Sequence, residues 1–176
     1  KQTVQTLNHA HIPSATGGSG CLFVLGNDRF PDDVDIYLPN EHHDEADALF
    51  QCVSYRYEST QENVRNSNPE GNHSIQLTSD LMLTIQGKRY DLALTAEVLE
   101  HRLEAEFEGE KVAFYPPEDV LLIKALLQRG TDVGKHDIED IEKFLKIFPH
   151  LRAEYLQKRI SALEAGERVK NVFGAL

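Results

Sequence analysis

Hydrophobic and polar residues alternate along much of the first 115 residues, and helical spacing replaces this alternation afterwards. Alternation and short apolar runs predict strands at residues 12–16, 34–38, 53–58, 74–78, 81–85 and 89–94, and a small hairpin over 105–114. Helical spacing predicts helices at residues 42–52, 95–103, 118–128, 137–148 and 152–163. The polar residues 1–10 are expected to form a short helix. Residues 21–25 are expected to form another, because a serine-containing turn precedes them and Gly26 follows. Residues 59–72 are polar and rich in turn formers, so they are expected to form a loop.

This order of elements predicts an α+β (α/β) protein. A small mixed or antiparallel sheet is expected to be flanked by helices, and a helical part is expected to follow it. The dipeptide Pro116-Pro117 interrupts the pattern. We therefore expect a core of residues 1–115 and a C-terminal helical part of residues 116–176 that packs on this core.

Composition narrows the classes of function. The chain has 176 residues, 40% of them hydrophobic, and a formal net charge of −11. Such a charge excludes a uniform basic face for nucleic acid, although a local basic cluster stays possible. Two cysteines form no disulfide framework, which favours a reducing cytosol. No stretch reaches transmembrane length, so no membrane contact is expected.

The strongest candidate for chemistry is the pair Asp33 and Asp35, at the start of the strand predicted at residues 34–38. Alternate residues of a strand share a face, so both carboxylates are expected to point the same way. Two close carboxylates repel each other unless a cation lies between them or one of them takes up a proton. Mg²⁺ suits such a pair, because it prefers carboxylates together with substrate phosphates. Asp-x-Asp is also common as two solvated acids.

A glycine turn precedes this pair by about one short helix. Gly17, Gly18 and Ser19 lie just before the expected helix start. Glycines let the backbone approach a phosphate, and a helix start offers free N–H groups. Together the turn and the two carboxylates predict a phosphate-binding turn opposite a metal site.

The residues Gly17-Gly18-Ser19, Arg29 and Asp33-Val34-Asp35-Ile36 resemble the signature of the DNA polymerase beta-like nucleotidyltransferase superfamily. In that signature a hydrophobic residue and Gly-Gly/Ser are followed, some ten to fourteen residues later, by Asp-hydrophobic-Asp/Glu-hydrophobic. The spacing here falls at the long end, and Gly17 stands where the superfamily has a hydrophobic residue. Arg29 resembles the arginine often found there in small bacterial members.

The superfamily uses a third carboxylate on a neighbouring strand, and Asp91 is the candidate that this resemblance implies. Asp91 lies in the predicted strand at residues 89–94. By resemblance it would complete the metal site or act as the base for the incoming hydroxyl. A solvated strand aspartate is the plain alternative.

The C-terminal part carries a second resemblance. The run from Pro117 to Ile141, with Lys124, Arg129, Asp137 and Asp140, is similar to the C-terminal motif of the AbiEii-type, minimal bacterial nucleotidyltransferase group. A lysine and a following aspartate of that motif belong to the active site, which implies Lys124 and Asp140, with Asp137 as a competing acid. Alternatively, Lys124 and Asp140 pair only to lock two helices together.

The resemblance implies a cytosolic nucleotidyltransferase that moves an NMP from an NTP to a hydroxyl group, with Mg²⁺ or Mn²⁺. The acceptor stays open among an RNA end, a protein and a small molecule. A catalytically silent fold that binds an antitoxin or another partner protein is the alternative, and an Asp91 that points away from the pair would favour it. A Ca²⁺ loop at residues 32–35 is a remote third hypothesis, because Val34 and Ile36 favour a strand.

Overall fold

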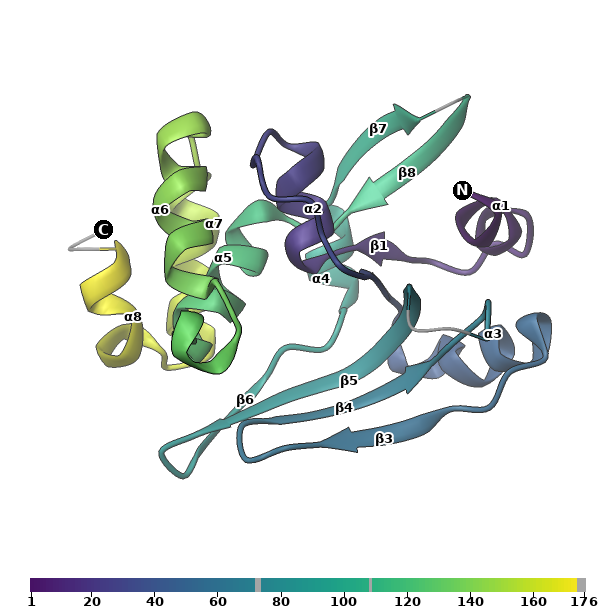
Figure 1. Ribbon diagram of the computed structural model, residues 1–176, viewed down its shortest axis with the longest axis horizontal. Helices are drawn as coiled ribbons and strands as arrows, with labels where there is room; N and C mark the ends of the chain where they lie inside the picture. The colour runs from purple at the N-terminus through teal and green to yellow at the C-terminus, as the bar shows by residue number, and fades with distance from the viewer. Residues whose placement is uncertain (72–73, 108, 174–176) are drawn as a thin grey trace.

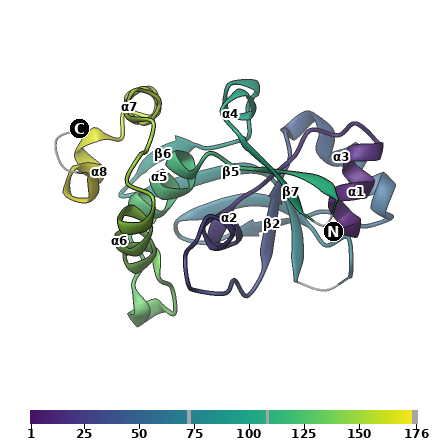
Figure 2. The ribbon, with the colours of Figure 1, turned by 90° about the horizontal axis from the view of Figure 1, so that it is seen from above.

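The computed structural model describes residues 1–71, 74–107 and 109–173. A twisted sheet runs through the molecule, with helices at its two ends and on its faces (Figure 1). The C-terminal helices gather at one end of the sheet, whereas the N-terminal helix α1 and helix α3 lie at the other end (Figure 2). The expected class, a mixed sheet flanked by helices and followed by a helical part, is confirmed.

The sheet has eight strands in the described part of the chain, in the order β3-β4-β5-β2-β1-β8-β7, with β6 paired to β5. Strand β2 lies inside the sheet, antiparallel to β1 and parallel to β5. Their bounds are β1 Ala15–Thr16, β2 Val34–Tyr37, β3 Tyr55–Glu58, β4 Glu62–Ser67, β5 Ile75–Ile85, β6 Lys88–Asp91, β7 Leu103–Phe107 and β8 Glu110–Phe114.

Strand β4 corrects the expectation of a loop over residues 59–72. Its sequence is polar, but Val64 is buried and the backbone pairs with β3 on one side and β5 on the other. The buried Asn66 side chain accepts a hydrogen bond from Thr78 on β5 (3.0 Å). Polar residues can therefore fill an interior strand here, because neighbouring strands satisfy them.

Strand β5 joins the two segments predicted at residues 74–78 and 81–85 into one. Asp80 has a left-handed backbone (φ 54°), and the β4–β5 register shifts nearby. The first half of β5 pairs with β2, and the second half pairs with β6. This division of one strand between two neighbours decides which residues lie beside the carboxylates.

The helices follow the expected order, with one addition near the C-terminus. That addition is helix α8, which lies beyond the last helix predicted from the sequence. The bounds are α1 Gln2–His9, α2 Gly18–Val24, α3 His43–Phe50, α4 Ala96–Glu100, α5 Pro117–Leu127, α6 Asp137–Ile147, α7 Ala153–Ala162 and α8 Gly166–Phe173, with short 3₁₀ turns η1 Asn40–His42 and η2 Thr131–Val133.

Helix α5 connects the helical part to the sheet. It is buried along almost its whole length and belongs to the larger of two apolar clusters, together with residues of the sheet and of α6, α7 and α8. The smaller cluster lies under α1 and α3. Because α5 packs against α2, β5, α6, α7 and α8, it fixes the helical part beside β5, the strand that pairs with the carboxylate-bearing β2. Among the described residues, no helix has the length and apolar character needed to cross a membrane.

Candidate active site

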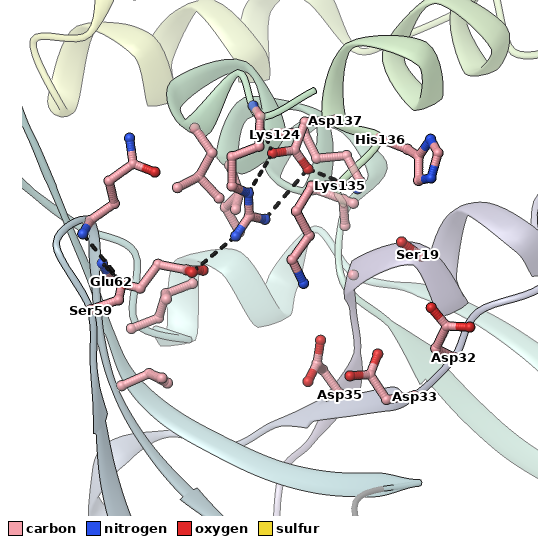
Figure 3. A pocket seen from close by; sticks show the side chains of 18 of the residues that line it. Ser19, Asp32, Asp33, Asp35, Ser59, Glu62, Lys124, Lys135, His136 and Asp137 are labelled. Carbon is pink, nitrogen blue, oxygen red and sulfur yellow. Dashed lines mark hydrogen bonds and ion pairs between the residues drawn. The ribbon is translucent and has the colours of Figure 1, made fainter. Parts of the chain in front are cut away.

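The two predicted carboxylates lie together on one wall of an open cavity. Asp33 immediately precedes β2 and is exposed, whereas Asp35 lies in β2 and is half-buried. Both side chains point the same way, toward the cavity (Figure 3). The cavity measures about 1080 Å³ and lies between the sheet, the start of α2 and the helices α5 and α6. It is therefore large enough for a nucleotide-sized ligand.

The pair is electrostatically unbalanced. Burial is the main cause that raises the pKa of Asp35, from 3.8 to about 7, and the negative charges of Asp33 and Glu62 add to it. The ammonium groups of Lys135 and Lys124 act in the opposite direction. Within the described residues, no hydrogen bond or ion pair to the side-chain oxygens of Asp33 or Asp35 is present. A cation between the two carboxylates would relieve this repulsion.

The glycine turn lies against Asp35. Gly17 donates its N–H to the Asp35 carbonyl oxygen (2.9 Å), and helix α2 begins one residue later. A Cβ on Gly17 would lie 2.4 Å from the Tyr37 ring. Gly18 has a left-handed backbone (φ 59°), and a Cβ there would lie 2.9 Å from Asp35 Oδ2. Only glycines let the turn come this close to the carboxylate.

Ser19 and Arg29 connect this turn to the helical part. Arg29 Nη2 donates to Ser19 Oγ (3.1 Å), and Arg29 also holds Asp140 on α6 through Nε (3.1 Å) and Nη2 (2.5 Å). The structure thus brings together predicted site residues that are 111 positions apart in the sequence.

Lys124 belongs to the same network. Its ammonium lies 2.8 Å from Asp140 Oδ2 and 3.3 Å from Asp137 Oδ1. Burial alone would raise the pKa of Asp140, but hydrogen bonds from Arg29 and Lys124 outweigh burial and lower this pKa. Both aspartates are therefore occupied by cations, and the predicted pairing of Lys124 with Asp140 between two helices is present. Lys124 also lines the cavity, so pairing does not remove it from the site.

Asp91 is not brought to the carboxylate pair, which corrects its expected place in the site. It is exposed on β6, accepts a hydrogen bond from the backbone N–H of Ala93 (3.1 Å), and lines a separate depression. Asp91 pairs with Met82, whereas Asp35 pairs with Gln76 on the same strand. Six residues of strand separate these positions by about 20 Å. The residue beside Asp35 on the neighbouring strand is thus an amide, Gln76.

Several cavity residues were not predicted as site residues. Glu62 lies on β4, in the segment expected to be a loop, and it binds Arg129 Nη1 (2.9 Å). Arg129 Nε also binds Asp137 (2.7 Å). Arg129 lies within the C-terminal motif, and this position could have indicated that it belongs to the site. Tyr55 and Tyr57 face the same cavity from β3, and only the alternation of that strand pointed to them.

The mixed sheet and the helices around it have the nucleotidyltransferase fold. The chain belongs to the family described as "Nucleotidyl transferase of unknown function" (DUF2204), which matches residues 1–170. The resemblance to the nucleotidyltransferase superfamily is thereby confirmed.

Solved structures of nucleotidyltransferases share this fold. TM1012 from Thermotoga maritima, a protein assigned to the nucleotidyltransferases, has a TM-score of 0.59 at 15% identity, over 82% of this chain and 89% of its own. The antibiotic-resistance factor ANT(2'')-Ia, solved with adenylyl-2''-tobramycin, has a TM-score of 0.56 at 16% identity, over 94% of each chain. No curated protein matches the sequence. At these identities the likeness to solved structures is one of fold.

The raised pKa of Asp35 predicts that metal-free protein loses stability as pH rises. Between the unfolded pKa near 3.8 and the folded pKa of about 7, the folded state holds a proton that the unfolded state has released. The free energy of unfolding should fall across this window by roughly 2 kcal/mol more in the wild type than in Asp35→Asn, which cannot titrate. Urea unfolding between about pH 5 and about pH 8 with EDTA measures this difference. Parallel profiles of the two proteins would contradict it.

The buried network predicts a large cost for removing the Asp140 charge. Asp140→Asn leaves Arg29 and Lys124 with one carboxylate fewer, and losing one partner of a buried ion pair costs roughly 3 kcal/mol. Asp28→Asn is the matched control, because its pair with Lys143 is exposed and is worth at most about 0.5 kcal/mol. Denaturant unfolding of both variants gives the comparison. Equal losses would show that the Asp140 network does not hold the helical part in place.

Proposed function

We propose that this chain is a metal-dependent nucleotidyltransferase that moves an NMP from an NTP to a hydroxyl-bearing acceptor in the cytosol. The observation that carries this proposal is the pair Asp33 and Asp35, which faces a nucleotide-sized cavity beside the Gly17–Gly18 turn. Family membership supports the transfer reaction, and the cavity supplies a place for it.

The donor atoms fit Mg²⁺ or Mn²⁺. Asp33 and Asp35 offer hard carboxylate oxygens, and burial together with the charge of Asp33 raises the pKa of Asp35, so a cation beside the pair would stabilise both charged forms. No group of three His, Cys, Asp or Glu that could hold a metal occurs among the described residues, so two carboxylates would bind together with phosphate and water oxygens. Mg²⁺ is commonly held by one or two carboxylates plus substrate phosphates. When bound, the metal would neutralise charge on the phosphates during transfer.

The protein's own groups would position the nucleotide. Gly18 lets the chain pass close to Asp35, and Ser19 lies at the cavity wall with its hydroxyl held by Arg29. A phosphate between this turn and the carboxylates would meet backbone N–H groups of the first turn of α2. Such positioning is the main contribution of a protein to phosphoryl-type transfer.

The wall of the cavity that strands β3 to β5 form bears on the acceptor. Strands β3 to β5 and the turn between β3 and β4 contribute no lysine or arginine to the described lining. They present Tyr55, Tyr57, Ser59, Gln61, Glu62, Val64, Asn66, Gln76, Thr78 and Leu81. Arg56 on β3 pairs with Asp80 beside the separate depression, and Arg65 on β4 pairs with Asp44 and Asp47. A wall of tyrosines, amides and one carboxylate suits a small neutral or cationic acceptor better than the phosphates of an RNA end.

A second candidate function is favoured by the position of Asp91. A fold in which Asp91 lies away from Asp35 could bind a nucleotide, or an antitoxin or other partner protein, without catalysing transfer. Gln76 beside Asp35 is the specific observation behind this candidate.

Both the active enzyme and a silent nucleotide-binding fold must bind an NTP together with Mg²⁺. Calorimetry tests this shared property. Wild-type protein with Mg²⁺ should bind at least one of ATP, CTP, GTP and UTP in calorimetry, and Mg²⁺ plus that nucleotide should raise Tm. Asp35→Asn should bind the metal–nucleotide complex at least about tenfold more weakly, because one of two carboxylate ligands is lost. Asp28→Asn, an exposed change of equal charge, should bind as the wild type does. Absence of binding by the wild type at millimolar NTP would overturn the proposal.

Pyrophosphate release separates the two candidates. An active enzyme should release pyrophosphate from the bound NTP when a pool of small hydroxyl compounds is supplied, and Asp33→Asn or Asp35→Asn should slow release by about 100-fold or more. If the fold is silent, the wild type releases none, and Gln76→Glu, which adds a carboxylate beside Asp35, should create slow release. The Gln76→Ala variant controls for loss of the amide alone.

A further inference from the structure

Four lysine and arginine side chains line the cavity in the described part of the chain, and three of them already hold carboxylates. Arg29 pairs with Asp140, Lys124 with Asp137 and Asp140, and Arg129 with Glu62 and Asp137. The fourth is Lys135, for which the described residues provide no ion-pair partner. An anion that entered the cavity could therefore bind Lys135 without displacing a carboxylate.

Lys135 lies in the connection between α5 and α6, just after the 3₁₀ turn η2. Its backbone N–H binds the Gly130 carbonyl oxygen (3.1 Å), and Gly134 before it has a left-handed backbone (φ 68°). Asp137, two residues later, donates its N–H to the Arg129 carbonyl oxygen (3.0 Å). The backbone is thus tied at both ends of the turn, while the long side chain of Lys135 stays exposed.

The Lys135 side chain points across the open part of the cavity toward the carboxylates. In Figure 3 its ammonium lies between the ion-pair network of Lys124 and Asp137 and the pair Asp33 and Asp35. Its charge is near enough to oppose the rise in the pKa of Asp35. A phosphate chain that ran from a metal at the carboxylates toward α6 would pass this ammonium.

We propose that Lys135 is the residue of this chain that binds the polyphosphate of the nucleotide beyond the phosphate held at Asp33 and Asp35. This role rests on the proposed function and names a binding residue for that same cavity. A nucleoside triphosphate carries several negative charges, of which one divalent metal offsets only part. The three paired cations lose a carboxylate if they turn to a phosphate, which leaves that carboxylate uncompensated.

The chemistry of lysine suits this task. Its ammonium is a compact point charge on a flexible stem, so it can follow phosphate oxygens whose positions change between the triphosphate and the departing pyrophosphate. Lys135 donates hydrogen bonds and takes no part in bond making or breaking. It is therefore a positioning residue for the leaving group.

Calorimetry with matched variants tests this role. The probes are the best-binding NTP, its monophosphate and its nucleoside, each with Mg²⁺, and the variants are Lys135→Gln, Lys135→Arg and Lys143→Gln. Lys143 is the control, because it lies on α6 outside the cavity and pairs with Asp28. Lys135→Gln should weaken NTP binding by about tenfold, a typical loss for a hydrogen bond to a charged group. It should leave monophosphate and nucleoside binding unchanged, and Lys135→Arg should restore NTP binding.

Each outcome has a defined meaning. An NTP affinity of Lys135→Gln equal to that of the wild type would overturn the role of Lys135 while leaving the proposed function in place. Equal weakening of NTP and nucleoside binding would also overturn it, because it would indicate a structural role. If the wild type bound no NTP, the proposed function itself would fail. The Tm of ligand-free Lys135→Gln should match the wild type, since the exposed side chain forms no ion pair in the described structure.

Discussion

The ion pairs of Asp140 fix one side of the cavity relative to the other. This carboxylate is almost fully buried, and it binds Arg29 from the loop before β2 and Lys124 from α5. Burying it without both cations would be costly, so the loop, α5 and α6 must keep their relative positions. Because Arg29 also binds Ser19, the same network positions the first turn of α2. The distance between the glycine turn and the helical part depends on this one carboxylate.

A second set of buried ion pairs supports the first from the far side of α5. The opening turn of α5 carries two buried acids, of which Glu118 binds Arg152 and Asp119 binds Arg159 of α7. Helix α5 is thus held by polar pairs near its start and by Lys124 near its end, while apolar packing surrounds its middle. Such pairs contribute little net stability but disfavour other helix placements, because each misplaced partner would be a buried charge.

The sequence predicted those features of the fold that depend on residues close together in the chain. The alternation at residues 33–38 placed both carboxylates on one face. The resemblance of the C-terminal run to the AbiEii-type motif implied Lys124 and Asp140, with Asp137 as a competing acid. Strand β4 was missed because its stability comes from two neighbouring strands and not from its own polar sequence. The partners of Lys124 and Asp140 include Arg29, more than a hundred residues away from Asp140, and only the tertiary fold brings such groups together.

Asp91 shows where sequence order is insufficient. Nothing in the order of strands states that the first half of β5, and not β6, lies beside β2. That choice follows from the division of β5 between two partners around the left-handed Asp80, which side-chain alternation does not encode. Because the first half of β5 pairs with β2, Gln76 lies opposite Asp35. Asp91 on β6 pairs with the second half of β5 and therefore lies away from Asp35.

The amide of Gln76 changes the charge balance of the cavity. A third carboxylate beside Asp35 would add repulsion to a group whose pKa already lies near 7, whereas an amide adds none. The two carboxylates of Asp33 and Asp35 can be balanced by a single divalent ion, which then has little charge to spare for a triphosphate. The remaining charge of a triphosphate has to be met by the protein. Since the other lysine and arginine side chains that line the cavity in the described part of the chain are engaged with carboxylates, this demand would fall on Lys135 in the proposed reaction.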